Sequence, residues 1–441
     1  MLLTFLIYIG TALLVVNQRI GWNDVEGPAW LAVLLRTDLW FAFAAIVALP
    51  YLIKTSFEKH SKIVLLIIPF GFLIFTLLSS GYNLLQNKVF ADAFGLYDLC
   101  RCIISTIIGV AIYRISQSSS KFRNHLIQIL IFTPAIYVVA GLVFIVTGNN
   151  DIPFFDKNPY DLNPAAGIVG LGSRFQGLAS NPNIVAIQSA VAMGLIFPRL
   201  ILSKNQLLQK CAWAAYAAAL IAIMMWTGVR ALAVVFPSIL LIFSWMQSSF
   251  SKQGFLRGIK TVGLAGSCLG LFFVLINSLE STQVIQERFS GGDGRIFLWI
   301  YYGKLLLLNP IGFGLGFESI VDTDVSGMGL RLPPHNAILQ AGMYAGYAGA
   351  GLTLFLIYKV IGVIIRVKQA IRCKKPTHES DGVALAWCSL VINLMFAGML
   401  LADFNFSILT GLLLAQVSQI DRKGGLLKSH SQKENTCAEK T

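Results

Sequence analysis

Charged residues are scarce in this sequence, and their scarcity excludes most soluble folds. Only 12% of the 441 residues are charged, whereas 56% are hydrophobic, and the mean hydropathy is +0.71. A soluble domain carries about 25% charged residues, so this chain lacks the polar surface that keeps a large fold in water. The same apolar content excludes an intrinsically disordered chain. The composition therefore predicts a polytopic membrane protein.

Signatures of metal sites and soluble enzymes are also missing. The seven cysteines have no CxxC or other metal-like spacing, and none falls in a loop that we expect to face outward. A disulfide framework and a thiolate metal site are therefore not expected. The chain contains no GxSxG, P-loop or HExxH motif, which removes common hydrolase, nucleotide-binding and zinc-protease patterns. We expect no metal ion and no cofactor.

Long apolar runs are abundant, and they predict an all-α membrane protein with about twelve transmembrane helices. Each run approaches the length of a bilayer span, and the period-2 alternation of a membrane β-barrel is absent. We take residues 1–420 as one transmembrane helical domain and the polar tail 421–441 as a disordered cytoplasmic segment. The predicted spans are 2–16, 31–53, 63–79, 93–113, 126–147, 183–198, 208–226, 229–246, 261–279, 341–365, 384–401 and 405–420.

The distribution of basic residues predicts the orientation of these spans. Six segments that alternate with outward segments hold 22 of the 34 lysines and arginines, and the outward segments hold nine. Because basic residues collect in cytoplasmic loops, we expect both termini in the cytoplasm. The same rule accounts for the net charge of +13, so nucleic acid is not expected as a partner. Residues 2–16 lack a basic start and an A-x-A cleavage site, so we expect a retained first span.

Two of the expected outward loops are longer than a connector needs to be. They cover residues 148–182 and 280–340. The second contains RIFLWIYYGKLLLLNP, whose apolar residues Ile296, Trp299 and Ile300 predict a short helix lying in the membrane interface. A glycine-rich turn, IGFGLGF, follows it. Beyond that turn, AGMYAGYAGAG predicts close packing of span ten through small residues.

Arginines gather in the outward loops. The five outward arginines of interest are Arg174, Arg230, Arg288, Arg295 and Arg331. Arg230 falls in the first turn of span eight if Thr227 or Gly228 caps that helix. A cation there opposes the helix dipole unless an anion binds nearby. The alternative is an interfacial arginine that snorkels, and some of the five must pair with acidic residues of the same loops.

Three helix N-termini are expected to lie together at the outer surface, because spans six, eight and ten all run inward. Span six opens with Asn181 as its cap and Pro182 as its first helical residue, followed by Asn183. Span ten follows His335 and Asn336. Helix N-termini bind anions, and arginine suits a diphosphate because its planar fork binds two oxygens. A membrane lipid headgroup would supply such an anion at this depth.

His335 is the only histidine that we expect on the outer side. It has two interpretations, a turn residue that caps span ten or a functional group of the anion site. The other four histidines fall in basic cytoplasmic segments, where we expect solvated loop residues. They are His60, His125, His378 and His430.

Charged residues inside the spans call for partners or functions, since each costs roughly 2.5–3.5 kcal/mol at a helix centre. Asp98 and Arg101 are three apart on one helical face, so they can partly neutralise each other. Arg36 and Asp38 are two apart and do not face each other. We favour structural pairing for these charges, and Lys359 is expected to snorkel or to pair.

At these positions the sequence resembles the bacterial O-antigen ligases and the related O-antigen and exopolysaccharide polymerases. The resemblance covers mainly residues 165–355, and it depends on the order of several short motifs together with the long outward loop. The motifs are RFQGLASNPN, TGVRA, RIFLW, NPIGFGLG and HNAILQAGMYAGYAG. In TGVRA this chain departs from the family, which commonly has threonine directly before the arginine; here Val229 intervenes.

The resemblance implies a membrane-embedded glycosyltransferase of the GT-C type in the bacterial inner (plasma) membrane. Such enzymes transfer glycan from undecaprenyl diphosphate on the periplasmic side, without a metal or nucleotide sugar. The acceptor is lipid A core for a ligase and another lipid-linked glycan for a polymerase. By the resemblance we assign His335 and Arg230 to catalysis. The resemblance also implies diphosphate binding by Arg174, Arg230 and Arg295, and the expected helix starts add Asn183 and Asn336 to that set.

The implied mechanism leaves some choices open. The arginines and helix N-termini would stabilise the charge that develops on the diphosphate as it leaves. His335 would accept the proton of the acceptor hydroxyl or help to hold phosphate, and Glu318, Asp322 and Asp324 are rival bases. The main alternative function is a 12-span transporter or a lipid-linked oligosaccharide flippase. A short loop after span six and the outward position of the long loops argue against these classes.

Overall fold

The computed structural model describes residues 1–16, 34–53, 58–86, 88, 90–147, 182–202, 207–227, 232–247, 294–317, 334–373, 378–395 and 400–419. Within these ranges the chain is helical, with an isolated bridge between Ala91 and Leu315 and no strand. Six of the described helices are long and apolar enough to cross a membrane. The predicted all-α class is confirmed, and the composition of these helices agrees with a membrane protein.

Helical segments coincide with eleven of the twelve predicted spans, and the span 261–279 lies outside the described residues. Several of these helices are shorter than a full span, so twelve crossings and the orientation stay predictions. The tail 421–441 also lies outside the described ranges. The helices are α1 (Leu2–Ala12), η1 (Leu13–Val15), α3 (Thr37–Ile53), α4 (Lys59–Lys62), η2 (Ile63–Ile67), α5 (Ile68–Leu85), α6 (Ala93–Ser118), α7 (Ser120–Phe132), α8 (Ala135–Thr147), α9 (Pro182–Leu202), α10 (Leu207–Trp226), α11 (Leu232–Gln247), α14 (Gly294–Leu308), α16 (Ala337–Cys373), α17 (His378–Leu394) and the helix 404–419.

Local polar residues set where α6 and α7 begin. Asp92 precedes α6, and its carboxylate accepts a hydrogen bond of 2.6 Å from the backbone N–H of Gly95. Ser119 precedes α7, and its hydroxyl accepts from the N–H of Phe122 at 3.1 Å. Such caps satisfy backbone N–H groups that have no partner inside the helix. The single residue Ser119 between α6 and α7 makes them neighbours in space.

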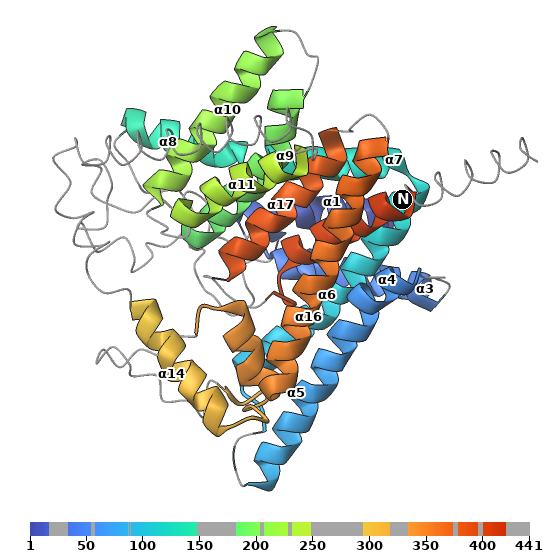
Figure 1. Cartoon of the computed structure of the whole chain (residues 1–441), viewed down its shortest axis with the longest axis vertical. Helices are drawn as coiled ribbons and strands as arrows, with labels where there is room; N and C mark the ends of the chain where they lie inside the picture. Colours follow the sequence, from blue (N-terminus) through green and yellow to red (C-terminus); the bar gives the residue numbers. More distant parts are fainter. Residues whose placement is uncertain are drawn as a thin grey trace, which may run out of the picture.

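Small residues allow two pairs of helices to approach closely. α9 packs on α17, where a Cβ added to Gly194 would lie 2.5 Å from the backbone nitrogen of Ala386. α5 and α16 run side by side in the lower half of the molecule (Figure 1). They are antiparallel, since Gly71 lies beside Leu352 and His60 lies beside Arg366. Close approach through small residues is the usual mode of packing between membrane helices.

α16 is broken near its start. Ala345 and Gly346 have non-helical backbone angles, and Gly346 has φ 62° and ψ −154°, a region open essentially to glycine alone. The preceding segment 309–317, which contains the glycine-rich turn, lies against the break. Three backbone hydrogen bonds join them: Phe313 N–H to Met343 O (2.7 Å), Gly314 N–H to Tyr344 O (3.0 Å) and Tyr347 N–H to Pro310 O (2.8 Å). The turn therefore satisfies groups that the break releases, as membrane helices require.

The same turn is held from its other side by the end of α5 and the start of α6. We call residues 309–317, with the parts of α5, α6 and α16 that they contact, the turn junction. The bonds on this side are Ser79 Oγ to Ile311 O (2.5 Å), Asn83 Nδ2 to Gly312 O (3.1 Å), Leu315 N–H to Ser80 Oγ (2.8 Å) and Asp92 N–H to Leu315 O (3.0 Å). α5 ends, and α6 and α16 begin, at this junction end of the bundle.

The opposite end of the bundle is joined by side chains instead. There α6 ends, α4 begins and the helix 404–419 ends. Three side-chain bonds connect these segments: Gln117 Nε2 to Ser418 Oγ (2.7 Å), Ser418 Oγ to Glu58 Oε1 (2.5 Å) and Gln419 Nε2 to Ser116 O (3.1 Å). About 26 residues of α6 separate the two ends, a distance of about 39 Å.

Candidate functional site

His335 has an unusual backbone conformation at the start of α16. Its φ is 47°, and in the described part of the chain it is the one non-glycine residue with positive φ. Left-handed backbone at a non-glycine residue is uncommon, although histidine adopts it more readily than most. Such strain gathers at functional sites, where surrounding structure maintains it. The side chain is partly exposed, two residues before the helix begins.

Asn336, rather than His335, is the cap of α16. Its Oδ1 accepts hydrogen bonds from the backbone N–H groups of Ile338 (3.0 Å) and Leu339 (3.1 Å). The capping interpretation of His335 is therefore wrong, since the neighbouring residue does that work. Two N–H groups that would face an anion are already satisfied by Asn336. Its Nδ2 group remains as a donor, so diphosphate binding by Asn336 would have to use that atom.

α14 confirms the short helix that was predicted in the segment RIFLWIYYGKLLLLNP, and Arg295 lies in its first turn. α14 buries Leu298, Tyr302 and Leu306, whereas Ile300 is 53% exposed. Leu306 approaches Gly342 of α16 so closely that a Cβ there would lie 2.7 Å from Leu306 Cδ2. The turn junction follows α14 directly, and α14 lies beside the start of α16 (Figure 1). Arg295 and His335 thus belong to two segments that pack on each other, α14 and the start of α16. The Arg295 side chain lies outside the described residues.

Asn183 lies in the first turn of α9, which begins at Pro182 as predicted. Asn181, the predicted cap, lies outside the described residues. α9 packs mainly on α17 and α10, not on the turn junction. The structure thus places Asn183 at a helix start, and its predicted partnership with His335 stays a prediction.

Two of the predicted arginines, Arg174 and Arg230, lie outside the described residues, as do the rival bases Glu318, Asp322 and Asp324. Thr227, a predicted cap of the following helix, ends α10 instead. Its hydroxyl donates to Met224 O at 2.5 Å, and its backbone N–H donates to Ile223 O at 3.1 Å. The next described helix, α11, starts at Leu232. Gly228 and Arg230 lie outside the described residues, so the place of Arg230 in a helical first turn stays a prediction.

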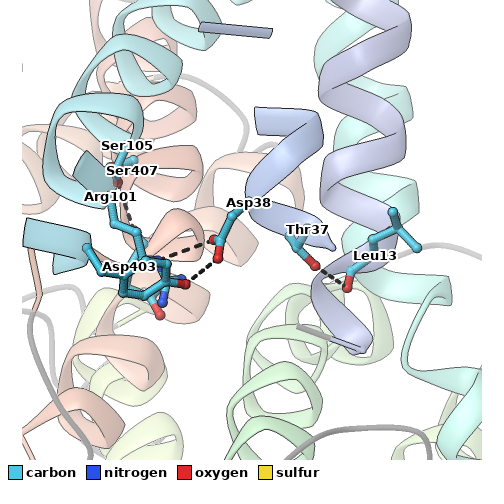
Figure 2. Close-up of polar contacts among 8 residues, drawn as sticks. Leu13, Thr37, Asp38, Arg101, Ser105, Asp403 and Ser407 are labelled. Carbon is cyan, nitrogen blue, oxygen red and sulfur yellow. Dashed lines mark hydrogen bonds and ion pairs between the residues drawn. The ribbon is translucent and has the colours of Figure 1, made fainter. Parts of the chain in front are cut away.

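Buried charges lie between α3 and α6 (Figure 2). Arg101 Nε is 3.4 Å from Asp38 Oδ1, and the two side chains are 5% and 3% exposed. The prediction that Arg101 and Asp98 pair along their own helix is incomplete, because Asp38 of another helix is the ion-pair partner. Tyr97 also donates a hydrogen bond to Asp38. Structural pairing of these charges agrees with the interpretation from the sequence.

The buried cluster extends to α16 and to the helix 404–419. The hydroxyl of Tyr344 donates to Asp98 Oδ2 at 3.0 Å, which ties the first half of α16 to α6. Ser105 of α6 bonds to Asp403 O (3.2 Å) and to Ser407 Oγ (2.5 Å) (Figure 2). Neither Tyr344 nor Asp403 was predicted, because tyrosine and aspartate at these spacings have no distinctive pattern. Tyr344 thus ties α16 to α6, and Asp403 ties the start of the helix 404–419 to α6.

The other predicted polar residues have simpler surroundings. Lys359 lies over the rings of Phe355 (4.9 Å) and Tyr358 (5.6 Å), so it interacts within its own helix. His60, His125 and His378 lie on α4, α7 and α17, so the expectation of loop residues is wrong for these three, and His430 lies outside the described residues. Among the residues that the structure describes, no three His, Cys, Asp or Glu side chains are grouped to hold a metal ion.

Comparison with known proteins gives a partial similarity. No family model matches the chain. A protein of Rickettsia prowazekii (strain Madrid E), named "Putative polysaccharide ligase RP358", is 28% identical over 112 residues. The match covers 22% of this chain and 28% of the relative, so the chain matches less than a third of the length of that curated protein. The similarity is distant, and the name of the relative describes polysaccharide ligation. The described part of this chain is helical, and its sequence is strongly apolar.

Proposed function

We propose that the protein is a membrane glycosyltransferase that transfers a glycan from undecaprenyl diphosphate to an acceptor in surface polysaccharide synthesis. The acceptor is lipid A core in the ligase version and another lipid-linked glycan in the polymerase version. The observation that carries the proposal is the strained backbone of His335, held at the start of α16 beside the helix that contains Arg295. The distant similarity to a protein named as a polysaccharide ligase supports the same class of reaction.

In this proposal the diphosphate binds near the starts of α14 and α16. Arg295 lies in the first turn of α14, and the N-terminal end of a helix favours negative charge. Arg174 and Arg230 would complete the set of cations. Their charge stabilises the diphosphate as the bond between its oxygen and the anomeric carbon breaks. His335 accepts the proton from the acceptor hydroxyl as that oxygen bonds to the anomeric carbon.

A deletion strain tests the proposed function directly. The carrier-lipid fraction and the surface glycan are extracted, and chain lengths are compared by gel electrophoresis and mass spectrometry. Full-length glycan on the carrier with a bare surface supports a ligase, and single repeats on the carrier or surface support a polymerase. Accumulation of single repeats on the cytoplasmic leaflet would support the flippase alternative and remove the basis for the role of His335.

Complementation of that strain tests the residues. His335→Ala should lower transfer at least a hundredfold, since general base catalysis contributes about 10²–10⁴-fold. His125→Ala is the matched control, because His125 is an exposed helical histidine of α7 near the opposite end. It should leave transfer unchanged. Near-normal transfer by His335→Ala would show that another group is the base.

Asn336 allows capping to be separated from anion binding. Asn336→Asp keeps an oxygen that can cap α16, but it removes the Nδ2 donor and adds negative charge. Asn336→Ser keeps the cap without the charge. We expect both variants to fold and Asn336→Asp to bind undecaprenyl diphosphate more weakly than Asn336→Ser. Since neither variant keeps the Nδ2 donor, affinities equal to that of the wild type for both variants would remove Asn336 from the diphosphate site.

A further inference from the structure

Gln340 is a buried polar residue with an unpaired side-chain oxygen in the described part of the chain. Its side chain is 7% exposed, and its Oε1 atom has no hydrogen-bond partner in the part of the chain that the structure describes. A buried acceptor without a partner destabilises a fold, so such groups in native proteins call for a ligand, a water molecule or an ion. Gln340 lies on α16, close to His335. A ligand bound near His335 would therefore be within reach of the unpaired oxygen.

The position of Gln340 is fixed by the first turns of α16. Its backbone N–H donates to Asn336 O at 2.8 Å, so Gln340 lies one turn after the cap and on the same face of the helix. One turn of helix rises about 5.4 Å. Long side chains on helices point back toward the helix N-terminus. The Gln340 carboxamide is therefore directed toward the start of α16, where His335 and Asn336 lie.

Tyr344 shows which way this face of the helix is turned. It lies four residues after Gln340, on the same face, and its hydroxyl donates to Asp98 of α6 at 3.0 Å. The ring of Tyr344 is 1% exposed. Since Tyr344 reaches into the bundle, Gln340 on the same stripe also faces the interior rather than lipid. Asn336, Gln340 and Tyr344 form a polar stripe that leads from the helix start toward the buried charges of α3 and α6.

We propose that the Gln340 carboxamide binds a hydroxyl group of the glycan that reacts at the start of α16. The proposal rests on the glycan-transfer function, and it adds a sugar-binding residue to that site. Oε1 accepts a hydrogen bond, and the hydroxyl groups of a sugar are its natural donors. A diphosphate diester in its ionised form has no proton to donate, so Oε1 pairs with the sugar and not with the carrier phosphates. The hydroxyl belongs to the donor glycan or to the acceptor glycan.

The test uses the full-length protein in lipid nanodiscs, with carrier-linked glycan extracted from the deletion strain. Gln340→Leu should raise the KM of one glycan substrate roughly three- to tenfold, the effect of one neutral hydrogen bond. Its kcat should stay within about twofold of the wild type, and its affinity for undecaprenyl diphosphate without sugar should not change. A rise in the KM of the carrier-linked glycan assigns the hydroxyl to the donor, and a rise for the acceptor assigns it there.

Gln416→Leu is the matched control. Gln416 is 6% exposed, and its Oε1 also lacks a partner among the described residues, but it lies on the helix 404–419 near the opposite end. This variant should leave both KM values unchanged. Neither leucine should lower the thermal midpoint, because each removes an unpaired acceptor from a buried position. Gln340→Glu keeps an acceptor oxygen at the same reach, and its KM should lie closer to the wild type than that of Gln340→Leu.

The outcomes separate the two proposals. If the wild type transfers glycan and Gln340→Leu has the same KM values, Oε1 holds only an ordered water, and the role of Gln340 is lost while glycan transfer stands. A lower thermal midpoint for Gln340→Leu, with Gln416→Leu unaffected, would give Gln340 a structural role instead. If the wild type neither transfers glycan nor binds undecaprenyl diphosphate, both proposals fail together.

Discussion

The two ends of the bundle are joined by different kinds of hydrogen bond. At the junction end, backbone groups of residues 310–315 pair with backbone groups at the broken start of α16 and at Asp92 before α6, and also with side chains of α5. At the opposite end, side chains such as Gln117 and Ser418 connect helices that are themselves unbroken there. A side-chain bond fixes two residues, whereas paired backbones fix the path of both chains. The paired backbones thus fix the path of α16 between Met343 and Tyr347, roughly two to three helical turns after His335.

The buried ion pair between Arg101 and Asp38 lies in the part of α6 nearer the junction. Arg101→Leu leaves Asp38 buried with only the Tyr97 hydroxyl, and we expect a loss of about 3–5 kcal/mol in the free energy of unfolding. The double variant Asp38→Leu with Arg101→Leu should recover much of that loss. Unfolding with denaturant in detergent measures both. Equal losses for the single and double variants would show that the pair is not the cause.

Gly346 tests whether the break in α16 is needed. A Cβ at this position would overlap the carbonyl of Pro310, and the backbone angles suit glycine alone, so Gly346→Ala should cost about 2–4 kcal/mol. Gly351→Ala in the same helix is the control, because nothing lies within 4 Å of its added Cβ. That change should be neutral or stabilise by up to about 1 kcal/mol. Thermal midpoints of the two variants give the comparison, and similar values would contradict it.

Ser80 and Ser418 compare the two ends at matched chemistry. Ser80 Oγ accepts from the N–H of Leu315 and donates to Thr76 O, whereas Ser418 Oγ bonds to Gln117 and Glu58. Each serine→alanine change should cost about 1–2 kcal/mol. We expect only Ser80→Ala to lower transfer as well, since it loosens the turn that positions α14 and α16. Loss of transfer in both variants would mean that overall stability, not the junction, limits activity.

The smallest expected change in stability is at His335. Glycine adopts its backbone conformation without strain, so His335→Gly should stabilise the fold by about 0.5–1 kcal/mol or leave it unchanged. Transfer should be lost, because the imidazole is gone. Thermal unfolding and complementation assay the two effects separately. A clear loss of stability would show that the His335 side chain contributes to packing, and the strain would then need another explanation.

Hydropathy predicted the positions of most helices, because burial in lipid demands long apolar runs with internal backbone hydrogen bonds. It also located α14, and the Asn-Pro capping pattern located the start of α9 at Pro182. The break at Gly346 was missed, since the break depends on a turn about 30 residues earlier that replaces the lost bonds. A glycine in an apolar run looks the same whether it permits close packing or a broken helix.

The candidate site could be predicted only in part. His335 was predicted as a candidate because it was the one histidine expected on the outer side. Its strained backbone agrees with a functional role at that position. The sequence left capping by His335 open as one of two interpretations, and the structure gives the cap to the adjacent Asn336, because both residues are compatible with a helix start. The partner of Arg101 was also missed, since Asp38 is 63 positions away and only tertiary structure brings them together. Periodicity along one helix cannot show contacts between helices.

The hydrogen bonds of Ser79, Ser80 and Asn83 also have a consequence for how the chain is made. Their partners in the turn lie 232, 235 and 229 residues later in the sequence. At about 5–20 residues per second, α5 must wait roughly 10–50 s after its own synthesis for those partners to emerge. During the wait, Ser80 can donate to Thr76 O and Asn83 to Ser79 O within the helix. These local bonds would let α5 enter the bilayer before the rest of its binding surface exists.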